Sequence, residues 1–180
     1  DSYKTMSFQV LNTSGYARRG ELTTKTCAVQ TPVFMPVGTY GTVKGLTPEH
    51  LHDIGFEIIL GNAFHLHQRP GLETIKKFNG LHDFMGWDKS ILTDSGGFQI
   101  WSLNDLRKIT EEGVEFKSPF DGSKIFMSPE DSIDTQLTLN SDIIMAFDEC
   151  TDYPSSYEDA EQSMHLTHRW TERSLNYFQK

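Results

Sequence analysis

Short apolar runs recur along the chain, and each of them ends in polar residues. Runs of this length are typical of strands that are buried on both faces. Four such strands are predicted, at residues 33–37 (VFMPV), 57–62 (EIILGN), 90–94 (SILTD) and 141–149 (SDIIMAFDE). Buried strands that are separated by helices predict a parallel α/β sheet.

The segments between these runs carry helix signals. Thr47 precedes Pro48 and Ser128 precedes Pro129, so each pair offers an N-cap followed by proline at the first helical position. Glycine gives the stop signals, at Gly55 for example. Four helices are predicted, at residues 47–55, 69–80, 128–140 and 157–180.

Two further segments have the alternation that is typical of antiparallel strands. Residues 7–32, approximately, alternate and are expected to turn at Ser14-Gly15 and at Arg19-Gly20. Residues 114–129 are expected to form a hairpin that turns on Asp121-Gly122.

The strand count bears on the type of α/β fold. An open doubly wound sheet and a barrel are both compatible with the pattern. A complete barrel needs eight strands and roughly 250 residues. The chain has 180 residues and four predicted parallel strands, so it would supply about half of a barrel.

Composition limits the classes of partner. The net charge is −9, which argues against broad nucleic-acid binding by this chain itself. Cys27 and Cys150 form no disulfide framework, so a reduced cytoplasmic setting is expected, and no run is long enough to span a membrane. No signal peptide is visible, and we expect both ends, at Asp1 and Lys180, to be the edges of a longer protein.

The candidate chemistry lies in ILTDSGGFQ, at residues 91–99. Asp94 ends one apolar run and Asp148 ends another, and ligand sites in parallel α/β folds lie at these strand ends. We therefore expect both carboxylates to lie close together. Gly96 and Gly97 would let a flat ligand approach the backbone, and Phe98 offers a ring for stacking.

Other interpretations of these residues stay open. Asp-Ser-Gly-Gly is also a common turn, and Asp94 could cap the next helix. Paired carboxylates could accept the N–H donors of a guanine-like base, or they could hold a divalent cation. His65 and His67 have the H-x-H spacing of some metal-dependent barrel hydrolases, and Asn62 is either a ligand contact or a turn residue.

Five blocks, spread in order over residues 35–154, resemble the tRNA-guanine transglycosylases, closest to the bacterial type and to the N-terminal half of the family. They are MPVGTYGTVKGL, ILGNAFHLHQRPG, GLHDFMGWDKSILTDSGGFQIWSL, DGSKIFMSPEDSI and SDIIMAFDECTDYP. The resemblance implies a TIM-type (β/α)8 barrel. Residues 1–180 would be its N-terminal half, with an antiparallel β cap at about residues 7–32.

The resemblance also implies an activity. Members exchange guanine at the tRNA wobble position for a 7-deazaguanine precursor of queuosine, through a covalent aspartyl-ribose intermediate. Asp94 matches the aspartate that accepts a proton and contacts the base, and Asp148 matches the one that reads its donor edge. The other residues that match the base pocket are Ser95, Gly96, Gly97 and Phe98.

Other parts of the family pattern are expected beyond residue 180. These are the nucleophilic aspartate, the zinc ligands and much of the tRNA-binding surface. The implied partners are tRNA, a guanine or 7-deazaguanine base, and a second copy in a homodimer, with no membrane. The chain alone is expected to be inactive.

Three alternatives remain beside this interpretation. The first is a non-catalytic transglycosylase-like subunit that binds tRNA. The second is a metal-dependent barrel hydrolase that uses His65 and His67, and the third is an inactive fragment with a structural role. Trp87 and Tyr153-Pro154 are expected to be packing residues, and Cys150 a buried small residue.

Overall fold

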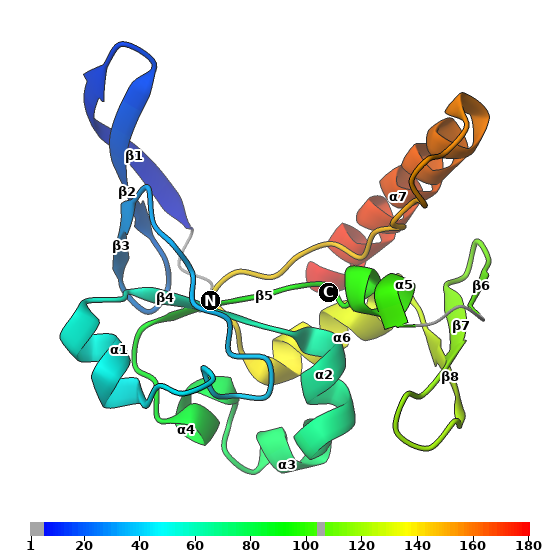
Figure 1. Cartoon of the computed structure of the whole chain (residues 1–180), viewed down its shortest axis with the longest axis horizontal. Coiled ribbons are helices and arrows are strands. Elements are labelled where there is room, and N and C mark those ends of the chain that lie inside the picture. The colour runs from blue at the N-terminus through cyan, green and yellow to red at the C-terminus, as the bar shows by residue number, and fades with distance from the viewer. Residues whose placement is uncertain (1–5, 104–106) are drawn as a thin grey trace.

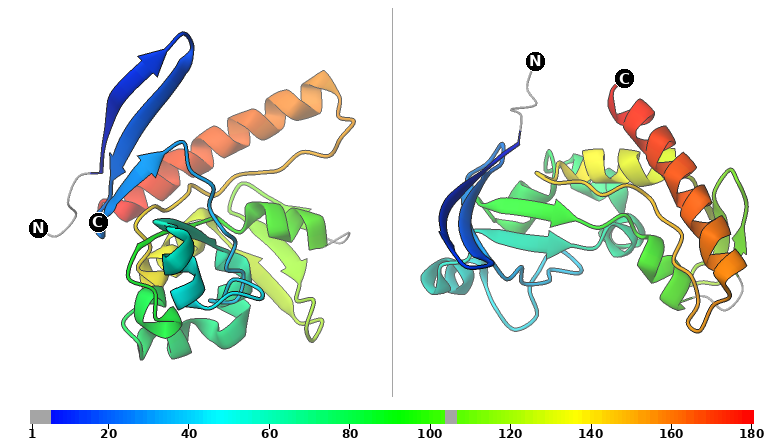
Figure 2. Two further views of the ribbon diagram at one scale, coloured as in Figure 1. Left: turned by 60° about the vertical axis from the view of Figure 1, so that its left-hand side comes forward. Right: turned by 90° about the horizontal axis from the view of Figure 1, so that it is seen from above.

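The computed structural model describes residues 6–103 and 107–180, so residues 1–5 and 104–106 of the predicted domain lie outside it. A parallel pair of strands, β4 (Ile58–Gly61) and β5 (Ser90–Thr93), lies at the centre of the molecule (Figure 1). Figure 2 shows the N-terminal hairpin at one end of this pair and the long C-terminal helix at the other.

Two more segments extend the parallel pair. Val37 forms a parallel bridge with Leu60 of β4, and Ile143 forms one with Leu92 of β5. Four parallel segments therefore lie side by side in chain order. This arrangement confirms an α/β fold, although no closed barrel occurs within residues 6–103 and 107–180.

The two outer segments are less regular than predicted. Residues 33–37 and 141–149 were expected to be buried strands, but each contributes a single bridge. Phe34 is 71% exposed and Met145 is 45% exposed. Each segment is the last of the parallel set in the described part of the chain, so no neighbouring strand covers it or extends its ladder.

The N-terminal sheet contains β1 (Ser7–Ser14), β2 (Ala17–Thr23) and β3 (Ala28–Thr31), all antiparallel. The turn predicted at Arg19-Gly20 is wrong, because Gly20 lies inside β2. A Cβ at Gly20 would lie 2.5 Å from Cζ of Phe8, so glycine here permits close packing of a ring and not a turn. The second turn instead lies between Thr24 and Cys27.

A third sheet contains β6 (Lys108–Ile109), β7 (Val114–Lys117) and β8 (Lys124–Met127). β7 and β8 form the antiparallel hairpin that the sequence predicts. Gly122 lies in its turn with φ +72°, a conformation that favours glycine.

Three predicted helices are confirmed, α1 (Pro48–Ile54), α6 (Pro129–Leu139) and α7 (Tyr157–Phe178). The prediction of one helix over 69–80 is wrong, because Arg69 is extended and Gly71 has a positive φ. The remaining helices are α2 (Ala63–Leu66), the π-helix η1 (His67–Gly71), α3 (Leu72–Lys76), α4 (Leu81–Met85) and α5 (Gly97–Leu103).

Two apolar clusters hold these elements together. One packs α1 to α4 against β4 and β5 and includes Trp87, which is 2% exposed as predicted. The other joins α5, α7 and the third sheet, with Phe147 stacked on Trp170 at 5.1 Å between ring centroids. Tyr153 is 98% exposed, so its predicted packing role is wrong. In the described part of the chain, no helix has the length and apolar character needed to cross a membrane.

Candidate functional site

Asp94 follows the last residue of β5, and its carboxylate points to the end of β4. Oδ1 accepts a hydrogen bond from the N–H of Ala63 at 2.8 Å, and Oδ2 accepts one from Nδ2 of Asn62 at 2.5 Å. The carboxylate thus ties the two parallel strand ends together at the start of α2. The Gly96 backbone N–H, directly before α5, is a further donor to it, so the structure does not contradict the capping alternative.

The surroundings of Asp94 change its acidity. Burial raises the pKa of its carboxyl group above the ordinary value. The hydrogen bonds from Asn62, Ala63 and the Gly96 backbone, and the nearby His65, lower the pKa but do not cancel the effect of burial. A carboxyl group with a raised pKa is suited to exchange a proton with a bound ligand.

Asp148 lies in the fourth parallel segment, beside the loop that follows Asp94. Ser95 Oγ donates a hydrogen bond to its Oδ1 at 3.0 Å, and Cys150 Sγ donates one to its Oδ2 at 3.7 Å. A Cβ at Gly97 would lie 2.6 Å from the carbonyl oxygen of Asp148 and 2.9 Å from its Oδ1. Glycine is therefore required at position 97 for the two loops to approach.

Both carboxylates line one cavity of about 400 Å³. Phe98 is 57% exposed beside it, with its ring centroid 5.6 Å from that of Trp101. The structure thus brings together most of the predicted site residues, with Gly97 packed behind Asp148. The full lining is Asp94, Ser95, Gly96, Phe98, Gln99, Met145, Ala146, Asp148, Thr167 and Thr171.

Sequence reasoning missed five of these lining residues, which are Gln99, Met145, Ala146, Thr167 and Thr171. Gln99 is the most informative, because its buried Oε1 has no hydrogen-bond partner among the described residues and is available to a donor on a ligand. It lies within the ILTDSGGFQ stretch, so the motif itself was the available signal. Thr167 and Thr171 lie one turn apart on α7, and their approach to the cavity depends on tertiary packing alone.

The H-x-H interpretation is wrong. His65 lies in α2 and His67 begins η1, so the segment is helical and not extended. Residues two apart on a helix differ in direction by roughly 200°. His65 lies 5.1 Å from the Tyr40 ring between centroids, whereas Nδ1 of His67 lies 3.1 Å from the amide nitrogen of Gln68. The two imidazoles do not form a shared ligand pair.

Metal binding finds no support in the described residues. Within residues 6–103 and 107–180, no group of three or more His, Cys, Asp or Glu side chains could hold a metal ion. The zinc ligands that the resemblance implies are expected beyond residue 180, and the chemistry proposed below does not pass through a metal.

Cys150 is half-buried and acts as a donor to Asp148. Burial, together with the charge of Asp148, raises the pKa of its thiol to about 11. The thiol therefore stays protonated at neutral pH, which argues against a nucleophilic role.

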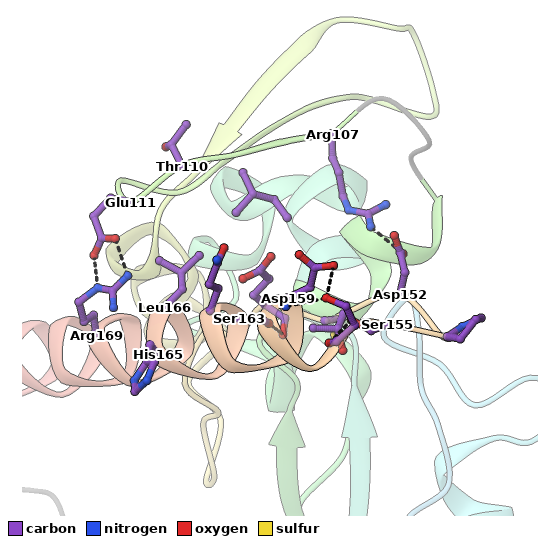
Figure 3. A pocket seen from close by; sticks show the side chains of 17 residues that line it. Arg107, Thr110, Glu111, Asp152, Ser155, Asp159, Ser163, His165, Leu166 and Arg169 are labelled. Atoms are coloured by element: carbon purple, nitrogen blue, oxygen red, sulfur yellow. Dashed lines mark hydrogen bonds and ion pairs between the residues drawn. The ribbon is translucent and has the colours of Figure 1, made fainter.

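A second cavity, of about 750 Å³, lies between α7, residues 107–111 and the loop after Asp148 (Figure 3). Its two arginines point to acidic partners across the opening. Arg107 pairs with Asp152 at 3.0 Å and Arg169 pairs with Glu111 at 2.7 Å. Because these charges are satisfied within the protein, the cavity has less of the character of a ligand site than the cavity between the carboxylates.

The cavity between Asp94 and Asp148 therefore has the features of one particular kind of ligand site. One carboxyl group has a raised pKa, a second is oriented by two donors, and an aromatic ring lies beside both. Such a site fits a planar ligand with N–H donors on its edge.

Comparison with known proteins gives the family. The family described as "Queuine tRNA-ribosyltransferase" matches residues 13–180, and the chain belongs to it. The queuine tRNA-ribosyltransferase of Dechloromonas aromatica (strain RCB) is 60% identical over 175 residues, which cover 97% of this chain and 47% of the relative. The protein of that name from Acinetobacter baylyi is 60% identical over 173 residues, 96% of this chain and 45% of the relative. The chain thus spans less than half the length of these relatives.

Proposed function

We propose that the complete protein is a tRNA-guanine transglycosylase, which exchanges the wobble guanine of tRNA for a 7-deazaguanine precursor of queuosine. The observation that carries this proposal is the meeting of Asp94 and Asp148 at one cavity in a chain of this family. The names of the relatives describe a ribosyltransferase that acts on tRNA, which supports the same reaction class.

The two carboxylates have different tasks in this proposal. Asp148 accepts the adjacent N1–H and amino donors of guanine. Ser95 and Cys150 each donate to one of its oxygens and so orient the carboxylate, and each oxygen can accept one more hydrogen bond from the base. Phe98 covers the base, and Gly96 and Gly97 leave room for it. Asp94 exchanges a proton with the base as the glycosidic bond breaks, a task that its raised pKa favours.

The covalent step needs a group outside the described residues. The bond between ribose C1′ and guanine N9 breaks, and its electron pair leaves with the base, which takes up a proton from the carboxyl group of Asp94. The carboxylate of an aspartate beyond residue 180 then forms an ester with C1′. The incoming 7-deazaguanine displaces this aspartate from C1′ and returns the proton to Asp94.

The proposed fold of the whole protein is a TIM-type barrel, with residues 1–180 as its N-terminal half and the β1–β3 sheet as a cap. The exposed apolar side chains of the outer parallel segments support this, since further strands would cover them. Zinc, most tRNA contacts and the homodimer interface are assigned to the remaining half. The complete enzyme is proposed to work in the cytoplasm.

The non-catalytic tRNA-binding subunit is the weaker alternative. A subunit that only binds tRNA has no need for a buried carboxyl group held by two donors. Both pocket carboxylates and the Asn62 partner are present here.

The test is exchange of labelled guanine into tRNA by the full-length enzyme and its Asp94→Asn variant. We expect the variant to lose exchange by on the order of 100-fold or more, because an amide cannot take up the proton. Its thermal melting temperature should stay near that of the wild type. Asp88→Asn is the matched control, since Asp88 is an exposed carboxylate paired with His52.

Two outcomes would contradict the proposal. If the Asp94→Asn variant exchanges guanine as fast as the wild type, Asp94 does not transfer the proton. Binding of tRNA without any exchange by the wild-type enzyme would favour the non-catalytic subunit.

A further inference from the structure

Helix α6 carries a fully buried amide, that of Gln136, which is 0% exposed. Its Oε1 accepts the N–H of Met145 at 2.8 Å and the Thr93 hydroxyl at 3.1 Å. Its Nε2 donates to the carbonyl oxygen of Met145 at 2.8 Å. One side chain thus satisfies both backbone groups of Met145 and reaches β5 as well.

These contacts determine the orientation of the Gln136 amide. The N–H of Met145 can only donate and its carbonyl oxygen can only accept. A side chain at this position must therefore present an acceptor and a donor side by side. An amide does so, but neither an ionised carboxylate nor an apolar side chain of similar length does.

The Gln136 amide bonds the fourth parallel segment just beyond the point where that segment stops pairing with β5. Residue Ile143 is held to β5 by its N–H to Ile91 and by its carbonyl to the Thr93 N–H, at 3.2 and 3.0 Å. After Ile143, the described residues include no further ladder between this segment and β5. Gln136 holds the backbone two residues later, and Asp148 follows three residues after Met145.

The same face of α6 also holds the loop of Asp94. Ser132 lies one helical turn before Gln136 and is 0% exposed. Its hydroxyl donates to the carbonyl oxygen of Ser95 at 2.7 Å. Ser95 directly follows Asp94, and its own hydroxyl reaches Asp148. Ser132 and Gln136 therefore contact the two segments that carry the pocket carboxylates.

We propose that Gln136, with Ser132, positions the carboxylates of Asp94 and Asp148 relative to each other and so determines which base the cavity accepts. This inference rests on the proposed function and deepens it. Neither residue lines the cavity, so both act through Met145, Thr93 and Ser95.

The physical reason lies in the geometry of the base edge. A carboxylate that accepts two adjacent N–H groups must be held to within about 0.5 Å. If Met145 is released, the carboxylate of Asp148 can move while still contacting one donor. Guanine would then lose much of its advantage over hypoxanthine, which lacks the exocyclic amino group.

The first variant is Gln136→Met in the full-length enzyme, since methionine has a similar length and cannot hold Met145. We expect the KM for guanine to rise about tenfold, which is the loss of one hydrogen bond to a charged group. The rise in KM should exceed the fall in kcat. The ratio of guanine to hypoxanthine use should fall by a similar factor.

The second variant is Gln136→Glu, which keeps the shape and removes the donor. Near neutral pH the introduced carboxylate would face the carbonyl oxygen of Met145, so the KM for guanine should rise. When the pH falls, the carboxyl group becomes protonated and can donate. We expect the ratio of variant to wild-type KM to shrink with falling pH, which a purely structural role would not produce.

Ser90→Ala is the matched control. Ser90 is fully buried at the other end of β5, where its hydroxyl bonds to Thr24 at 2.8 Å. Its loss should lower the melting temperature without changing base preference. If Gln136→Met does not fold, Ser132→Ala provides the same measurement, with a smaller expected change.

The outcomes separate the inference from the function on which it rests. Wild-type KM and base preference in folded Gln136→Met would overturn the inference and leave the exchange activity standing. An equal loss of base preference in Ser90→Ala would overturn it too, because the effect would then be general loosening. If wild-type enzyme exchanges no guanine, the proposed function fails, and the inference fails with it.

Discussion

At the scale of single residues, Asn62 and Asp94 form the closest contact of the site. Asn62 is 7% exposed and directly follows β4, and its amide donates a hydrogen bond to the carboxylate of Asp94 at 2.5 Å. This hydrogen bond stabilises the ionised carboxylate and opposes the effect of burial on its pKa. The acidity of Asp94 is therefore a balance between burial and a few donors.

This balance predicts a shift in the pH profile of Asn62→Leu. Removing the donor should raise the pKa of Asp94 further, so a higher pH is needed to ionise it. We expect the acid limb of kcat/KM for guanine exchange to move to higher pH. The measurement is a pH–rate profile of the full-length enzyme.

Asn176→Leu is the control for this experiment, because Asn176 is exposed on α7. Its acid limb should match that of the wild type. An unchanged limb in Asn62→Leu would show that Asp94 does not set the profile.

At the scale of elements, the parallel segments are joined at both ends by carboxylates. Asp142 joins neighbouring segments at the start of β5, as Asp94 does at the end of β5. Its side chain is 0% exposed, and Oδ2 accepts the N–H of Ile91 at 2.8 Å and lies 3.2 Å from Nε2 of His82 on α4. One carboxylate thus joins α4, β5 and the fourth parallel segment.

The same contacts predict how stability depends on pH. Burial alone would raise the pKa of Asp142, but the hydrogen bonds from His82, Thr26 and Ile91 outweigh it and lower the pKa overall. A lowered pKa means that the ionised form stabilises the fold at pH values above about 4. This contribution is lost as the pH falls through the pKa of the folded state.

The variant that measures this effect is Asp142→Asn. We expect its free energy of unfolding to fall less steeply than that of the wild type as the pH drops from about 5 to about 2. Urea unfolding at a series of pH values would measure both slopes. Equal slopes would mean that Asp142 does not contribute to acid sensitivity.

At the scale of the whole molecule, the chain leaves apolar surface at the two edges of its parallel set. Phe34 and Val37 are 71% and 48% exposed at one edge, and Met145 is 45% exposed at the other. Exposed apolar patches of this kind mark surfaces that contact other protein. In the proposed barrel, the remaining half would cover both edges at once.

This surface predicts a difference between two lengths of the protein. The 180-residue chain by itself should bind a hydrophobic dye such as ANS and self-associate, whereas a full-length chain should do neither. Dye fluorescence and sedimentation of both would test this. A monomeric 180-residue chain that binds no dye would contradict the proposed covering of the two edges.

The sequence alone determined the local elements with strong signals and the candidate pair of carboxylates. Thr47 and Ser128 cap their helices as expected, because a cap depends on residues three positions apart. Asp94 and Asp148 were identified because polar residues that end buried runs share one edge of a parallel sheet. The motif blocks also identified the family.

Only the tertiary structure decided which residues hold that pair in place. Gln136 and Ser132 lie on a helix whose sequence indicates nothing about Met145 or Ser95, because their contacts join segments that meet only after folding. The regularity of the outer segments was also beyond local sequence, since a strand needs a neighbour to pair with. The helical path through His65 and His67 likewise depends on packing around α2, which overrides the extended interpretation of their spacing.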